Sequence, residues 1–392
     1  MSPRKANPFK PTAGRMPPLL VGRDGIIDDF VEGLDDGPGA PGRLMCVTGA
    51  RGVGKTVMLT EFGRIARERK WEVIDETASD GLAKRLLERF VPNKPSVNLS
   101  VKPSLSVAGL GGLSLGEASV SSQRMPLTLR EAMGRRLDVL ERRRAGLLIT
   151  VDEAQSTARG DMVAIATAVQ HLTREERNIA FVFAGLPIIV SKWLNDDVLT
   201  FLRRAQSERL GDIPLAEVRG AFIDTFEESG IAIGGDALRM AVDATEGYPF
   251  MIQLVGYHVW RIAYRRQRDG AAAGKGMSVS EDDASEGVAN ALSRLGDTVH
   301  GPELDGLSPV DKTYLLAMAQ DDGPSSTSTI AERMGKDVGY ANIYRTRLID
   351  AQVIRDVGYG KVDFAIPYLR RYLREHAAYI RMSAHDGRPG RG

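Results

Sequence analysis

Three features are scarce in this 392-residue sequence: cysteine, net charge and long apolar runs. Cys46 is the single cysteine, so no disulfide can form within the chain. The 52 Lys and Arg nearly balance the 51 Asp and Glu, so no global field of one sign favours nucleic acid or an acidic membrane. The longest apolar run, residues 179–190, contains Gly185 and Pro187 and is shorter than the ~20 residues of a membrane-spanning helix. We expect a protein of the reducing cytoplasm without a membrane partner.

Residues 1–18 also lack the apolar core of a secretory signal, and they contain five prolines and several basic residues. This composition predicts a flexible arm. The chain as a whole has ample apolar sequence, since 43% of its 392 residues are hydrophobic. That content is sufficient for two or three domains, each with its own core.

Short β-type runs alternate with helical patterns between residues 43 and 213, within a domain expected to span residues 19–213. This alternation predicts an α/β fold in which helices wrap a parallel sheet. The expected strands are residues 44–48, 71–74, 146–151, 179–184 and 207–213.

Residues 96–120 interrupt this pattern with period-two alternation around Gly109, Gly111 and Gly112. The alternation predicts an inserted β-ribbon with a glycine bend. Two roles remain open for it: packing on the sheet, or contact with a protein or DNA partner.

No further strand and helix alternation follows Pro214. Residues 214–268 read as a helical lid, and residues 269–307 as a linker followed by a helix. Residues 308–380 then read helix, helix, helix, strand, glycine turn, strand and helix. This order predicts an α+β winged helix-turn-helix domain, followed by a tail at 381–392.

The first predicted strand leads into a glycine-rich loop of the form Gly-x-x-x-x-Gly-Lys-Thr, and a helix follows. Glycines allow backbone N–H groups to surround phosphates, and the helix N-terminus adds its dipole. Lys55 is placed to reach the β- and γ-phosphates, and the Thr56 hydroxyl to coordinate Mg²⁺. We therefore expect ATP and Mg²⁺ as cofactors, bound by Gly49, Arg51, Gly52, Val53, Gly54, Lys55, Thr56 and Val57.

The third predicted strand is a buried apolar run that ends at Asp152, and Glu153 follows it. Asp152 is expected to hold the Mg²⁺. Glu153 is placed to orient and polarise the attacking water, so this pair predicts ATP hydrolysis as well as ATP binding.

These two motifs resemble those of AAA+-like and STAND ATPases, especially the archaeal-type and actinobacterial ATPases that carry a C-terminal winged helix. Further matches are Val21-Gly22-Arg23, Asp152-Glu153-Ala154-Gln155 and Gly247-Tyr248-Pro249. The resemblance implies that Arg23 caps the adenine side and that Pro249 packs beside the base.

The same resemblance implies that Arg203 and Arg204 supply an arginine finger. A finger acting in trans requires a nucleotide-dependent homo-oligomer, although both arginines also fit the solvated face of a helix. Residues 183–187 lack the polar group that often senses the γ-phosphate, and no arginine follows Gly247 as a second sensor. These departures imply slow hydrolysis, with nucleotide acting as a switch.

In a winged helix the third helix enters the major groove and the wing contacts the DNA backbone. From residue 308 onward, however, the 13 basic residues exceed the 10 acidic ones by only three. Two hypotheses stay open: an ATPase that binds double-stranded DNA, and a STAND-type signalling or defence switch whose winged helix packs on the ATPase or a protein partner. The candidate DNA contacts are Asn342, Tyr344, Arg345, Arg347, Arg355, Tyr359 and Lys361.

Overall fold

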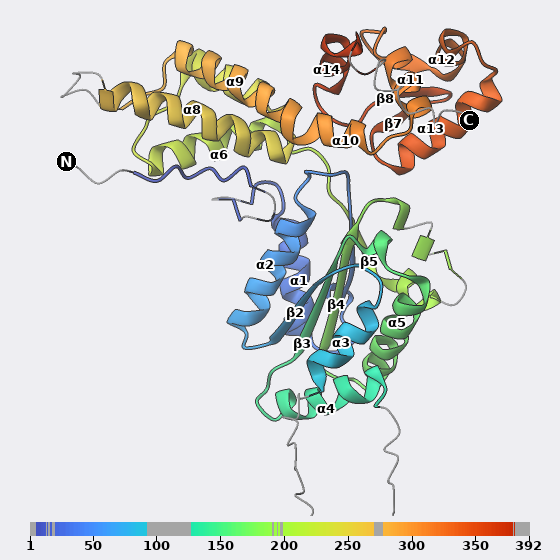
Figure 1. Ribbon diagram of the computed structural model, residues 1–392. Helices are drawn as coiled ribbons and strands as arrows, with labels where there is room; N and C mark the ends of the chain where they lie inside the picture. Colours follow the sequence, from blue (N-terminus) through green and yellow to red (C-terminus); the bar gives the residue numbers. More distant parts are fainter. Residues whose placement is uncertain are drawn as a thin grey trace, which may run out of the picture.

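The computed structural model describes residues 5–12, 14, 16–17, 20–91, 127–189, 192–193, 195–196, 199–269, 277–378 and 380. Within them a sheet domain, a helical lid and a C-terminal domain follow one another along the chain (Figure 1). The predicted ribbon at 96–120 and the tail at 381–392 lie outside the described residues.

The sheet domain contains five strands in the order β2-β3-β4-β1-β5, and every pairing is parallel. Apolar β-branched and aromatic residues dominate β3 and β4, which are buried along almost their whole length. The α/β fold with a parallel sheet is thus confirmed. The strands are β1 (Leu44–Thr48), β2 (Glu72–Thr77), β3 (Leu147–Asp152), β4 (Ile179–Gly185) and β5 (Gln206–Arg209).

Side chains alternate between the two faces of the sheet, and each face has its own core. Met45 and Val47 of β1 pack with α1 (Asp24–Asp36) and α2 (Lys55–Glu68). Cys46 faces the other core, where burial raises the pKa of its thiol to about 12. That second core is covered by α3 (Leu82–Phe90), α4 (Leu129–Glu141) and α5 (Arg159–Arg174) (Figure 1).

The lid consists of four helices rather than the three expected within 214–268. The fourth helix, α9, packs on α8: Gly287 lies so close to Val259 that a Cβ there would come within 2.6 Å of it. Arg266 and Asp283 form an ion pair of 2.7 Å between the same two helices. The lid helices are α6 (Leu215–Glu228), α7 (Gly235–Asp243), α8 (Pro249–Asp269) and α9 (Glu281–Leu295).

A π-helical turn at Gly296–His300 leads from the lid into the C-terminal domain. This domain has a separate apolar core and an antiparallel sheet in the order β6-β8-β7. Its element order fits the predicted winged-helix-like arrangement. The elements are α10 (Gly301–Asp305), α11 (Pro309–Met318), β6 (Ser325–Ser326), α12 (Thr327–Met334), α13 (Val338–Asp350), β7 (Ile354–Gly358), β8 (Lys361–Phe364) and α14 (Leu369–Glu375).

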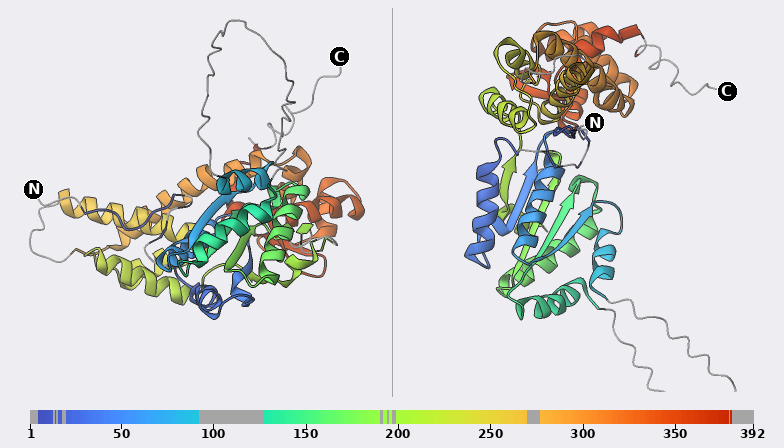
Figure 2. Two further views of the ribbon diagram at one scale, coloured as in Figure 1. Left: turned by 90° about the horizontal axis from the view of Figure 1, so that it is seen from below. Right: turned by 90° about the vertical axis from the view of Figure 1, so that its left-hand side faces the viewer.

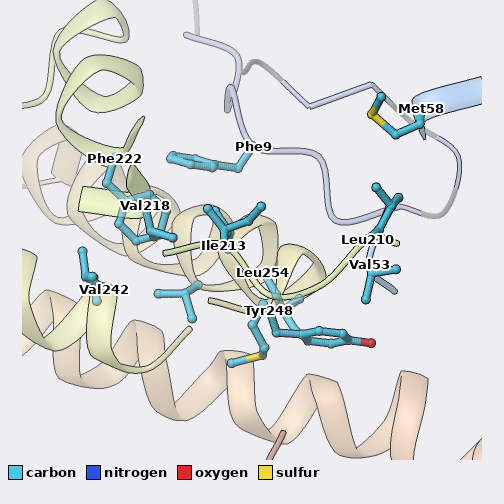
Figure 3. Close-up of a cluster of buried hydrophobic side chains, with 14 of the residues drawn as sticks. Phe9, Val53, Met58, Leu210, Ile213, Val218, Phe222, Val242, Tyr248 and Leu254 are labelled. Atoms are coloured by element: carbon cyan, nitrogen blue, oxygen red, sulfur yellow. The ribbon is translucent and has the colours of Figure 1, made fainter. Parts of the chain in front are cut away.

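Residues 5–12 lie between the lid and the sheet domain (Figures 1 and 2). Phe9 is only 1% exposed and belongs to the core that the lid shares with one face of the sheet (Figure 3). This packing differs from the free arm that the sequence suggested. Among the residues described, no helix combines the length and apolar character required to cross a membrane.

Candidate nucleotide site

The glycine-rich loop leaves β1 at Thr48 and ends where α2 begins at Lys55. Gly54 is the residue before the helix, with a φ of 97°. The first N–H groups of α2 have no partner within the helix, so they are available to an anion at this end. The loop therefore has the geometry of a phosphate-binding site.

Lys55 is buried inside the loop, with 6% of its surface exposed. Its Nζ donates hydrogen bonds to the carbonyl oxygens of Gly49 (3.0 Å) and Ala50 (2.9 Å). Burial lowers the pKa of Lys55, while the nearby Glu153 and Asp152 carboxylates raise it. The ammonium has three N–H groups, so one remains available to a phosphate oxygen.

Asp152 and Thr56 meet as expected for a shared metal site. The Thr56 hydroxyl donates to Asp152 Oδ2 at 2.5 Å, and the Glu153 N–H donates to Asp152 Oδ1 at 2.9 Å. No group of three or more His, Cys, Asp or Glu in the described part of the chain could hold a metal by itself. A Mg²⁺ here would need further oxygen ligands from water and from phosphate, which matches the usual preference of this ion.

Glu153 lines the cavity beside the loop and has a left-handed backbone with a φ of 53°. Its Oε2 accepts a hydrogen bond from the Gln155 amide. The Gln155 Oε1 accepts the Leu186 N–H at 3.1 Å, just past the end of β4. Gln155 therefore joins Glu153 to the strand tip that lacks a polar side chain of its own.

The sequence did not point to Tyr248 as a site residue, yet it holds the loop directly. Its hydroxyl donates to the carbonyl oxygen of Arg51 at 2.8 Å, and burial raises its pKa. A Cβ at Gly52 would lie 1.9 Å from the Tyr248 hydroxyl oxygen, so only glycine fits at that position. The Gly-Tyr-Pro motif thus brings the lid against the phosphate loop.

Arg51 also contacts the C-terminal domain, through a partner that the sequence did not reveal. Its Nη1 donates to Glu303 Oε1 of α10 at 2.6 Å, and this hydrogen bond raises the pKa of Arg51. The Glu303 side chain is only 10% exposed, whereas that of Arg51 is 54% exposed. One residue of the phosphate loop is therefore held by both the lid and the C-terminal domain.

Arg23 and Pro249 both line the cavity beside the loop, and their roles at the adenine stay predictions. Arg23 Nη2 donates to Gly211 O at 2.6 Å, and burial lowers the pKa of its guanidinium despite Asp212 and Glu217. A cavity of about 250 Å³ adjoins both residues. Of the predicted nucleotide contacts, its lining includes Arg23, Arg51, Gly52, Val53, Gly54, Lys55, Thr56, Val57 and Pro249.

Arg203 and Arg204 end a short 3₁₀ turn at Thr200–Arg204, and both are exposed. Neither lines the cavity. Arg203 Nη2 donates to Asn195 O at 3.3 Å. Their role as a finger toward a neighbouring molecule stays a prediction.

The structure separates the candidate DNA contacts into two groups. Asn342, Arg347, Tyr359 and Lys361 are exposed, although Arg347 pairs with Asp311 at 3.2 Å. Tyr344 and Arg345 are half-buried, and Arg355 is exposed with acidic groups nearby. Tyr344 donates to Tyr340, Arg345 pairs with Asp356, and Arg355 acts electrostatically on Asp212 and Glu246.

The family model of the AAA ATPase domain matches residues 19–182, which include both nucleotide motifs. A domain of unknown function, DUF8462, matches residues 297–373. No curated protein matches the chain at a significant level.

Two solved structures are similar over nearly the full length of the chain. The ORC2 protein of Aeropyrum pernix, solved as ADPNP–ADP complexes, has 14% identity and a TM-score of 0.60, and the match covers 96% of this chain and 98% of that one. The Walker-type ATPase PABY2304 of Pyrococcus abyssi has 18% identity and a TM-score of 0.61, with 91% and 96% covered. At such identities the likeness shows a shared fold.

Proposed function

Because residues 19–182 form an AAA ATPase domain, this chain is an AAA+ P-loop ATPase, and we propose that it acts as an ATP-dependent molecular switch. Lys55 and the loop N–H groups would bind the phosphates, and Thr56 with Asp152 would hold Mg²⁺. Glu153 would orient the attacking water as a general base. The tip of β4 offers no polar side chain to the γ-phosphate, which supports slow turnover over motor activity.

The contact between Arg51 and Glu303 carries this proposal, because it joins the phosphate loop to the C-terminal domain. Phosphates bound in the loop would bring strong negative charge close to Arg51. The guanidinium would then be shared between Glu303 and the nucleotide. If bound ATP stabilises either the paired or the unpaired state of Arg51 and Glu303, the position of the C-terminal domain shifts accordingly.

Small-angle X-ray scattering tests the switch on the full chain, with Glu153→Gln present in every variant to prevent turnover. We expect ATP to change the radius of gyration of this parent protein. A further Glu303→Gln substitution should give the ATP-bound dimensions without nucleotide. Asp35→Asn, which breaks the 2.9 Å pair with Arg69 far from the loop, is the matched control. Identical scattering by all variants with and without ATP would contradict the proposal.

Duplex DNA is the partner that we propose for the C-terminal domain. Support comes from α12 and α13, which form a helix-turn-helix pair next to the β7–β8 wing. Asn342 can bond a base edge in the major groove, and Arg347 and Lys361 can bind phosphates. Arg355 is exposed and stays a candidate for a phosphate contact, whereas Arg345 is half-buried and already paired with Asp356.

One observation favours a protein partner instead, as in a STAND-type switch. Ile343 is 65% exposed on α13, which also carries exposed Val338, and the wing carries exposed Val357 and Tyr359. Exposed apolar side chains of this kind gather at protein interfaces. Arg203 and Arg204 would additionally face a second copy if ATP brings copies together.

Fluorescence anisotropy with random duplex separates the two partners. The logarithm of the DNA-binding constant should fall linearly with the logarithm of the salt concentration, with a slope of about −0.9 per phosphate contact. Lys361→Ala should reduce this slope by about one contact, whereas the matched control Lys70→Ala on the sheet domain should not. Absence of binding at low salt would favour the protein partner.

A further inference from the structure

Residues 5–12 are anchored in the lid by one aromatic side chain, that of Phe9. The Phe9 ring packs against Phe222 and Phe226 of α6, with centroid distances of 5.7 and 5.2 Å (Figure 3). On α8 the ring rests on Gly256, where a Cβ would come within 2.4 Å of two ring carbons. The lid thus has a fitted pocket for this ring, and Gly256 provides the space.

Hydrogen bonds fix the direction of the segment on both sides of Phe9. Asn7 Nδ2 donates to Tyr257 O at 2.9 Å, and Asn7 Oδ1 accepts the Phe9 N–H at 3.0 Å. The Lys10 N–H then donates to Gln253 Oε1 at 3.1 Å. All three bonds involve α8 or the segment itself, so docking of the segment is tied to the lid helix that begins at Pro249.

The same segment continues into the nucleotide cavity. Lys10, Pro11 and Thr12 line that cavity together with residues 51–58 of the phosphate loop and α2. A Cβ at Gly14 would lie 3.7 Å from Thr56 Cγ2, so this part of the chain is in van der Waals reach of the Mg²⁺-site threonine. One wall of the cavity therefore belongs to the N-terminal segment.

We propose that residues 5–12 are a strap of the nucleotide site, anchored by Phe9, which must leave the lid before nucleotide can exchange. Nucleotide in the cavity would contact both the loop and the strap. Nucleotide binding and strap docking therefore stabilise each other, and undocking limits nucleotide release. This inference rests on nucleotide binding at the proposed site, but it needs neither ATP hydrolysis nor the contact of Glu303, so it can fail while the proposed switch holds.

Stopped-flow dissociation of a fluorescent ADP analogue tests the strap. Phe9→Ala removes the ring that occupies the lid pocket. Gly256→Ala adds a methyl group to α8 in the space that the ring needs. The docking free energy lost with a buried aromatic anchor is large, so each variant should raise the dissociation rate by roughly tenfold or more. The double variant should release no faster than the faster single variant, because both changes remove the same docking. Val139→Ala, which removes an exposed apolar side chain on α4 away from the lid, should leave the rate unchanged.

Damage to the lid is separated from loss of the strap by two further measurements. Gly256→Ala exchanges glycine for the best helix former in the middle of α8, so its thermal unfolding should show an intact lid. In the wild type, hydrogen exchange of an N-terminal peptide that includes Phe9 and Lys10 should slow when ADP is added. The proposal would be overturned if both folded variants release the ADP analogue at the wild-type rate. It would also be overturned if ADP leaves the hydrogen-exchange rate of that peptide unchanged.

Discussion

At the residue scale, Gln155 is the side chain whose contacts bear most directly on turnover. It donates to Glu153 and accepts from Leu186, so it fixes the carboxylate relative to the end of β4. We predict that Gln155→Glu lowers kcat by about tenfold with little change in KM, because the new carboxylate keeps the Leu186 bond and repels Glu153. Glu153→Gln should lower kcat by about 10²-fold or more.

Phosphate-release assays over a range of ATP concentrations measure both effects. Gln170→Glu on the outer part of α5 is a matched control, since it adds the same charge on a helix that does not line the cavity. A rise in KM without a fall in kcat would show that Gln155 acts on binding, and the positioning role would then fail.

How far single residues could be predicted depends on how local their partners are. The loop, Asp152 and Glu153 were predictable because each motif is contiguous and has one chemistry. Tyr248 and Glu303 were not, since they contact Arg51 across 197 and 252 positions of sequence. Their side chains carry no local signal that distinguishes them from ordinary lid and surface residues.

At the element scale, the strands and most helices follow from periodicity, while membership of a domain does not. Helix α9 is the helix expected in residues 269–307, and the structure places it at Glu281–Leu295. Its packing on the lid was not predicted, because the apolar face that fits α8 is made of small residues, including Ala284, Gly287 and Ala291. Close approach of two helices through small side chains becomes visible only once both are placed.

The turn that joins α9 to α10 contains a buried histidine, which predicts a response to acid. His300 Nε2 lies 2.8 Å from Pro367 O, and burial lowers the pKa of the ring to about 4. The unfolded chain, with an ordinary histidine pKa of about 6.5, takes up the proton first as pH falls. Stability should therefore be fully present above about pH 6.5 and fall by up to about 3 kcal/mol toward pH 4.

Calorimetric unfolding between pH 7.5 and 4.5 measures this loss, with His300→Gln as the comparison. The variant lacks the titrating ring, so the C-terminal domain should lose less stability over this interval than in the wild type. Equal slopes for wild type and His300→Gln would rule out this histidine as the source.

At the scale of the whole molecule, three units converge on one phosphate loop. The strap lines its cavity, the lid contacts it through Tyr248, and the C-terminal domain contacts it through Glu303. Each contact ties a change at the nucleotide to an element that lies far away in the sequence. This convergence is the physical basis for coupling between nucleotide and a partner bound by the C-terminal domain.

Such coupling must be reciprocal, which gives a prediction that needs no assumption about its direction. If ATP changes the affinity for duplex DNA by a given factor, duplex must change the affinity for ATP by the same factor. The two titrations, DNA anisotropy with and without ATP and nucleotide binding with and without duplex, should therefore agree in Glu153→Gln protein. Couplings of this kind are typically about 5- to 150-fold.

In Glu303→Gln the coupling factor should approach one while each ligand still binds alone. The variant removes the contact between the loop and the C-terminal domain and leaves both sites in place. A coupling factor that is unchanged in this variant would mean that the signal travels by another route.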